Sequence, residues 1–267
     1  MEMATGEKIR LLVRADDAGS SWSSNMGCLK ACTDGIVRSV EVMMPCAWIS
    51  HAARLFNARP EIDVGIHLTL TSEWDAVRWR PLTDARSLVD EDGYFRPLLM
   101  PRPGDDRPSL QESDWSVDDI ARELRAQIER GVAAFDNASH VSAHMAPHFS
   151  AFDQRVGEIV AELCREFQLI DVPPGHGLTR FEGYAKHPRS AERREAAFVE
   201  QLGALQAGTY MFVDHPAVES PELRATGHKG YEDVLQDRTT CLPVLVSEGV
   251  KAAVSSNAIE LIGYRDL

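Results

Sequence analysis

The chain has 267 residues, a length at which an α/β barrel commonly forms one domain. It carries 28 basic and 41 acidic residues, and its net charge of −13 disfavours nucleic acid and anionic membrane surfaces as partners. The five cysteines are scattered without a close Cys-x-x-Cys pair, so we expect neither a disulfide framework nor a thiolate zinc site. No apolar run reaches the roughly 20 residues of a membrane span, and we expect a cytoplasmic location.

The first part of the chain alternates between strand and helix patterns. A mainly apolar run up to Val13 is followed by Asp16 and Asp17 and then by Gly19, which is typical of a buried strand that ends in an acidic turn. Further strands are predicted over 36–44 and 62–70. One helix is expected to begin within 20–24 and to end at 34–35, and a second is expected over 48–57. This βαβαβ order predicts parallel strands joined by right-handed crossovers.

The later elements follow a long irregular segment. Residues 72–115 are rich in Pro, Asp and Arg, and a stretch of this length between elements is usually functional or disordered. Beyond it we predict helices over 117–135, 151–167, 191–206, 230–238 and 247–256, strands over 140–144, 169–172, 209–213 and 259–262, a loop over 175–190 and a short segment at 243–246. The sequence therefore predicts one α/β domain over 1–267. Its expected architecture is an incomplete or distorted (β/α) barrel of about seven parallel strands, with a long loop insertion at about 72–115.

Residues able to bind a metal or move a proton stand at the carboxyl ends of four predicted strands. Because these ends converge on one mouth in a barrel of parallel strands, we expect the side chains to meet there. A carboxylate with two imidazoles suits zinc or another first-row ion and is less typical of magnesium. Each residue alone also fits a structural role, as we expect for the deeper His140, but four strand ends together favour an active site. The residues are Asp16, Asp17, His67, His144, His148, Asp214 and His215.

Five segments resemble a known family, the YdjC-like carbohydrate deacetylases, also called chitooligosaccharide deacetylases. Val13–Gly19 resembles their Asn-Ala-Asp-Asp-Phe-Gly opening, and Gly65–Thr71 their Gly-x-His-Leu-x-Leu-Thr. His140–His148 is similar to their His-x-Asp-Ser-His-x-His-x-His, and Met211–Pro216 to their Met-x-His-Pro. Ile259–Leu267 resembles the family's C-terminus, so the likeness covers nearly the whole chain.

The resemblance implies a distorted, incomplete β/α barrel that holds one divalent metal. The donor set favours zinc, and magnesium or another divalent ion is the alternative. The ligands of this metal would be Asp17, His67 and His144, with Asp16 as general base and His215 as general acid. The implied reaction is removal of acetyl groups from N-acetylated sugars or oligosaccharides by a metal-activated water. A small carbohydrate is thus the expected partner, and a homodimer is one candidate assembly.

The chain departs from the family pattern at three places. Arg14 replaces the asparagine before Ala-Asp-Asp, Ser142 and Ala143 replace Asp-Ser, and Ala146 replaces the middle histidine. The loss of an aspartate at position 142 removes a carboxylate that could orient a ligand, and such losses weaken metal affinity or activity by about 10–100-fold. A non-catalytic sugar-binding or regulatory protein is therefore an alternative, as is another metal-dependent barrel enzyme such as a sugar isomerase.

Several neighbouring residues have two possible roles. Trp74 and Trp79 could stack on sugar rings or pin the long loop to the barrel. Arg14 could fix the Asp pair or contact substrate, and Asp214 is a candidate partner for the His215 imidazole. His148 is a candidate substrate-binding or supporting residue.

Overall fold

The computed structural model describes residues 8–173, 175–184 and 189–267. Within these ranges the strands are β1 (Ile9–Ala18), β2 (Ser39–Val42), β3 (Asp63–Leu68), β4 (Ala138–Ala143), β5 (Thr179–Arg180), β6 (Gly208–Asp214) and β7 (Glu260–Ile262). The α-helices are α1 (Trp22–Thr33), α2 (Ile49–Phe56), α3 (Val117–Ala134), α4 (Gln154–Phe167), α5 (Ala191–Gly203), α6 (Pro221–Arg224), α7 (Val234–Val246) and α8 (Glu248–Ser256). None of these helices is both long and apolar enough to cross a membrane.

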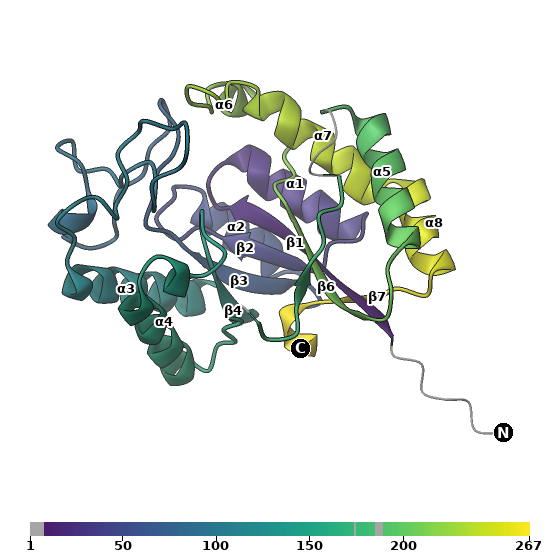
Figure 1. The fold of residues 1–267 in the computed structure, drawn as a ribbon, viewed down its shortest axis with the longest axis horizontal. Coiled ribbons are helices and arrows are strands. Elements are labelled where there is room, and N and C mark those ends of the chain that lie inside the picture. The colour runs from purple at the N-terminus through teal and green to yellow at the C-terminus, as the bar shows by residue number, and fades with distance from the viewer. Residues whose placement is uncertain (1–7, 174, 185–188) are drawn as a thin grey trace.

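The described strands form one parallel sheet in the order β4-β3-β2-β1-β6-β5. The last strand, β7, pairs in parallel with the first part of β1, while the later part of β1 pairs with β2. In Figure 1, α3 and α4 flank one end of the sheet and α5, α7 and α8 the other. The predicted incomplete β/α barrel is therefore confirmed.

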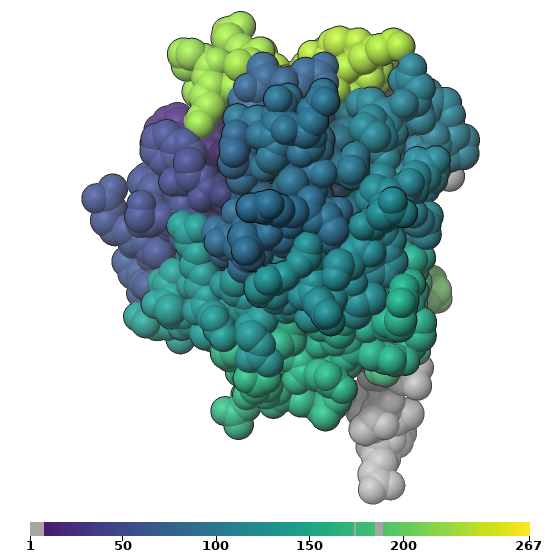
Figure 2. Space-filling view, turned by 90° about the vertical axis from the view of Figure 1, so that its left-hand side faces the viewer, coloured from purple at the N-terminus to yellow at the C-terminus, as the bar shows by residue number. Residues whose placement is uncertain are grey.

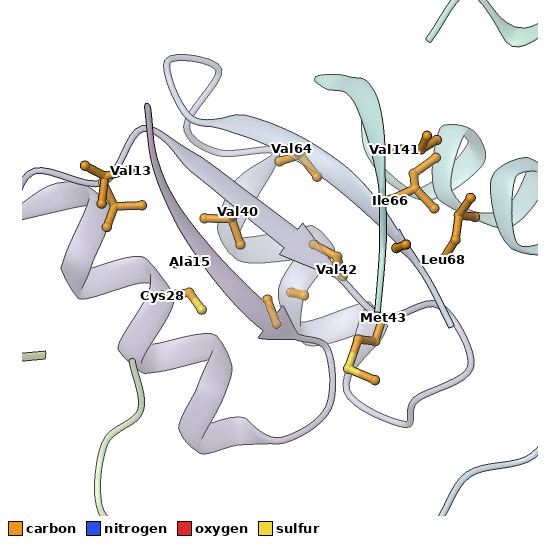
Figure 3. Packing of buried hydrophobic residues seen from close by; sticks show 14 of the residues in the cluster. Val13, Ala15, Cys28, Val40, Val42, Met43, Val64, Ile66, Leu68 and Val141 are labelled. Carbon is orange, nitrogen blue, oxygen red and sulfur yellow. The ribbon is translucent and has the colours of Figure 1, made fainter. Parts of the chain in front are cut away.

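The two faces of the sheet have different chemistry, because side chains alternate along each strand. On the outer face, Val13 and Ala15 of β1 are fully buried with Cys28 of α1 in the main apolar core, as Figure 3 shows. On the inner face, Leu12 packs against Ile262 and Tyr264 in a smaller cluster. The next inward positions of β1 carry polar side chains, which places them inside the barrel near its carboxyl end.

The segment between β3 and α3 covers this carboxyl end. It contains one short 3-10 helix, η1 (Arg86–Leu88), and in Figure 2 its blue and blue-green residues occupy much of the visible face. Trp79 is buried, and its indole N–H donates to the Thr71 carbonyl at 2.6 Å. Phe95 is also completely buried, so the segment has a packed interior of its own.

Three sequence-based expectations about elements are wrong. Residues 169–172 make only an isolated bridge, between Ile170 and His140, because Ile170 and Val172 pack against the inner cluster instead of extending a strand. The expected loop at 175–190 contains the two-residue strand β5, and its residues 185–188 lie outside the described residues. The helix expected at 230–238 begins only at Val234, and it is continuous with the segment expected at 243–246. The two form one helix, α7, which continues through Pro243 because Val244 and Leu245 are buried in the core.

Candidate active site

The two adjacent aspartates at the end of β1 reach the same pocket. In regular strand geometry they would point to opposite faces. Here the β1–β2 register shifts between Ala15 and Ala18, and Asp17 adopts a left-handed conformation with φ of 69°. Such irregularities re-aim side chains beside functional sites. Asp16 and Asp17 consequently both line a pocket of about 620 Å³ at the carboxyl ends of the strands.

Asp17 meets two histidines from neighbouring strands. Its Oδ1 atom lies 3.4 Å from Nδ1 of His144 and 3.7 Å from Nε2 of His67. The two imidazoles approach each other at 3.3 Å between His144 Nδ1 and His67 Nε2. One ligand atom from each of the three residues lies within 4.8 Å of the others, and all three side chains are buried.

This group fits a divalent metal. Asp17 Oδ1 is buried and accepts no hydrogen bond from any residue that the structure describes. A buried carboxylate oxygen without a partner is costly, and here it faces two nitrogen atoms that can carry lone pairs. One carboxylate and two imidazoles form a donor set that zinc and related ions prefer.

The other oxygen of Asp17 is held by a cation from α7. Arg238 donates to Asp17 Oδ2 at 2.7 Å, and both side chains are buried. Burial alone would raise the pKa of Asp17, but Arg238 and the nearby histidines hold it well below its usual value. The carboxylate therefore stays ionised.

The two histidines differ in charge although they touch. Burial lowers the pKa of His67 to about 4, against the attraction of Asp16 and Asp17, so its imidazole is neutral near pH 7. Burial also disfavours charge on His144, but the carboxylates of Glu73 and Asp17 raise its pKa to about 10. His144 Nε2 lies 3.1 Å from Glu73 Oε2, which leaves Nδ1 facing Asp17. A carboxylate on the far nitrogen of a ligating histidine fixes the tautomer and orientation of the ring.

Asp16 has a different environment from Asp17. Arg14 donates two hydrogen bonds to it, from Nε to Oδ1 and from a terminal nitrogen to Oδ2, both at 2.7 Å. A further N–H of Arg14 donates to the Tyr264 hydroxyl at 3.0 Å. Asp16 Oδ2 remains 3.6 Å from His67 Nε2. Arg14 thus holds Asp16, and it also lines the pocket, so both roles considered for Arg14 stay predictions.

His215 lies on the other side of Asp17, with 40% of its side chain exposed and Nε2 4.0 Å from Asp17 Oδ2. Among the described residues no hydrogen bond reaches its imidazole. Asp214 accepts from the backbone N–H of His215 at 2.8 Å and from the Tyr184 hydroxyl, so it is not the partner of the His215 ring. Burial raises the pKa of Asp214.

Three other predicted residues lie around or outside the pocket. Trp74 lines it and is nearly buried, with its ring stacked on His228 at a centroid distance of 5.8 Å. Trp79 makes an edge-on contact with His144 at 6.4 Å and is not among the residues that line the pocket, which agrees with the expected structural role. His148 is separate from the three-residue group, because its Nε2 lies 3.2 Å from Asp171 in an adjoining small cavity of about 40 Å³.

A family model described as "YdjC-like protein" matches residues 10–256. The chain belongs to this family. Two similar relatives of the YdjC-like chain are the chitooligosaccharide deacetylase of Yersinia enterocolitica and the carbohydrate deacetylase of Geobacillus stearothermophilus. Each is 30% identical to it, over 269 and 262 residues respectively, with 96% of both chains covered.

A solved structure from Enterococcus faecalis V583, described as a "putative cellobiose-phosphate cleavage protein", has the same fold as the YdjC-like chain. The TM-score is 0.74 at 19% identity, with 97% of this chain and 98% of the other covered. At this identity the likeness concerns the fold alone.

Sequence reasoning missed three charged residues of this YdjC-like site. Glu73 comes from the covering loop, Arg238 from α7, and Glu41 from the inner face of β2. None of them stands at a predicted strand end. The one available signal was Glu41, a charge inside the β-branched run at 36–44, which is unusual for a buried strand.

Proposed function

We propose that this chain is a metal-dependent hydrolase that removes acetyl groups from N-acetylated sugars. The observation that carries the proposal is the buried, unpartnered Oδ1 of Asp17, which faces two imidazoles in a pocket that also holds Asp16 and His215. The names of the relatives, both carbohydrate deacetylases at 30% identity over 96% of the chain, support the substrate class and reaction.

Asp17, His67 and His144 would hold the metal, for which zinc fits the donor set best. A divalent ion at such a site supplies a Lewis acid that acidifies water and polarises an amide carbonyl. The ionised Asp17 and the neutral His67 are ready to bind it. His144 must give up its Nδ1 proton, while Glu73 keeps the Nε2 side oriented.

Asp16 is suited to accept the proton of the attacking water. Both of its oxygens accept hydrogen bonds from Arg14, which fixes the carboxylate plane and leaves each oxygen a further lone pair. Its Oδ2 lies near His67 Nε2 and so close to the centre of the three-residue group. The carboxylate is therefore held where a base is needed.

His215 is suited to protonate the departing amine. It is the most exposed of the proposed catalytic side chains, and it lines the pocket beside Asp17. Water adds to the amide carbon, the C–N bond breaks, and the nitrogen takes a proton from His215. The products are acetate and a free amino sugar. Asp16 releases to solvent the proton that it took from water, the acetic acid formed loses its own proton, and His215 takes one proton back from solvent.

Substitutions of Asp16 and His144 test the proposal. We expect Asp16→Asn to keep bound metal but to lose acetate release from N-acetylated mono- and oligosaccharides, because the amide cannot take the proton. His144→Ala should lose both metal and acetate release. Asp63→Asn is the control, since Asp63 is also a buried, ion-paired aspartate but lies at the start of β3, away from the pocket.

Metal content and acetate are measured with several divalent ions and with a chelator. Full activity of Asp16→Asn would refute its role as base. A wild-type protein that holds no metal and whose activity a chelator leaves untouched would refute the whole mechanism. Metal binding without acetate release from any of these sugars would instead identify a non-catalytic sugar-binding protein.

A further inference from the structure

A chain of buried side chains leads from His67 to a carboxylate that the proposed mechanism does not use. His67 Nδ1 lies 2.7 Å from Ser142 Oγ, and the Ser142 hydroxyl donates to Glu41 Oε2. The other Glu41 oxygen lies 2.5 Å from His140 Nε2. Glu41 and His140 have no exposed surface, so this carboxylate is placed and held entirely by protein.

The sheet is shaped to admit the Glu41 side chain. Glu41 of β2, Gly65 of β3 and His140 of β4 occupy one row across three parallel strands. A Cβ atom on Gly65 would lie 2.2 Å from Glu41 Oε2 and 2.3 Å from His140 Nε2. The glycine therefore opens the path by which the carboxylate crosses β3. In the next inward row His67 is the register partner of Ser142, which completes the chain.

The hydrogen bonds can run in only one direction. Burial would raise the pKa of Glu41, but His140 and Arg14 lower it to about 2, so the carboxylate is ionised and can only accept. Ser142 must then donate its single proton to Glu41 and accept from His67. His67 Nδ1 is then the donor to Ser142 Oγ, so a singly protonated imidazole carries its proton on Nδ1 and turns the lone pair of Nε2 toward Asp17 Oδ1.

We propose that Glu41, acting through Ser142, is a positioning residue that holds His67 in the tautomer able to bind the metal. The inference rests on the proposed function. It also explains how the chain tolerates serine where the family pattern has aspartate, because a carboxylate from β2 takes the place of one on β4. Removal of such a supporting contact typically weakens metal affinity by about 10–100-fold.

The first test measures Zn²⁺ affinity by competition with a chelating dye. We expect Ser142→Ala and Glu41→Gln to weaken it about 10–100-fold. Ser39→Ala is the matched control, because Ser39 is a buried serine whose hydroxyl lies 3.3 Å from His140 Nε2, at the far end of the same chain. Its affinity should equal that of the wild type.

The second test restores a carboxylate at position 142. Ser142→Asp in the Glu41→Gln background should recover most of the lost affinity, since Asp can accept directly from His67 Nδ1. ¹⁵N NMR of the imidazoles in the metal-free protein reports the tautomer without metal or activity. We expect a proton on Nδ1 of His67 in the wild type and in Ser39→Ala, and a tautomer mixture in Ser142→Ala.

Unchanged Zn²⁺ affinity and an unchanged His67 tautomer in Ser142→Ala would overturn the inference. So would a loss in Ser39→Ala as large as that in Ser142→Ala. If Glu41→Gln does not fold, Ser142→Ala and Ser39→Ala decide the matter alone. Failure of the proposed function would appear as absent acetate release in the wild type. The Zn²⁺ affinity and the His67 tautomer are both measured without acetate release, so the two failures can be told apart.

Discussion

At the scale of single residues, the site separates two adjacent carboxylates by giving each its own arginine. Arg14 takes both oxygens of Asp16, whereas Arg238 takes only Oδ2 of Asp17 and leaves Oδ1 free. Asp17 is thereby open to a metal on one side, while Asp16 has a fixed plane. The assignment of Asp17 as ligand and Asp16 as base follows this difference, and both roles stay predictions.

Replacing Arg238 should be much more costly than replacing an exposed arginine. Arg238→Met leaves the ionised Asp17 buried without its cation, and loss of one partner of a buried pair lowers the free energy of unfolding by about 3–5 kcal/mol. The control is Arg224→Met, since Arg224 pairs with Glu219 on the surface and such pairs contribute about 0–1 kcal/mol. Urea unfolding of the metal-free proteins measures both. Equal losses would contradict the ion-pair assignment.

The site residues that could be predicted from the sequence are those that directly follow a recognisable apolar strand. Asp17, His67 and His144 follow apolar strands, and parallel strands bring their ends together, as the structure does. Glu73 and Arg238 could not be found in this way. They reach the site from a loop and a helix whose placement depends on packing with distant parts of the chain.

At the scale of elements, β3 depends on a residue without a side chain. Gly65→Ala should lower the free energy of unfolding by about 3 kcal/mol or more, because the new methyl group displaces the buried Glu41–His140 pair. Gly203→Ala is the control. It lies at the end of α5 with no atom within 4 Å of the added Cβ, so it should be neutral or stabilising by up to about 1 kcal/mol. Thermal and urea unfolding measure the change in both variants. Equal changes in Gly65→Ala and Gly203→Ala would mean that the Glu41 side chain can move aside at no cost.

Elements whose apolar residues repeat at a regular spacing were predicted well, whereas elements whose bounds depend on tertiary packing were not. The helix expected over 117–135 is α3, because Ile120, Leu124 and Ile128 form a buried stripe. A helix at 230–238 and a separate segment at 243–246 were expected, but burial of the residues after Pro243 keeps α7 continuous. The strand β5 has two exposed residues and so no apolar pattern to detect.

At the scale of the whole molecule, the buried network ties stability to pH. The pKa of Glu41 is lowered from 4.5 to about 2, so its contribution is complete above about pH 4.5 and is lost as the pH falls toward 2. Its full size is on the order of 3 kcal/mol. The free energy of unfolding in urea should differ most between the wild type and Glu41→Gln near neutral pH, and this difference should shrink as the pH falls from 4.5 to 2. A difference that does not change with pH would contradict the lowered pKa.

The strand that carries both aspartates is paired with segments about 200 residues or more further along the sequence, and this constrains how the protein folds. Residues 9–15 of β1 pair with 208–214 of β6, and 10–12 pair with 260–262 of β7. Contacts between such distant segments close late and slow the folding of a domain. During synthesis β1 therefore leaves the ribosome long before β6 and β7, with an apolar edge that can aggregate. Asp17 gains its Arg238 partner only once α7 has been made, so the nascent chain has no complete site until translation has passed residue 238.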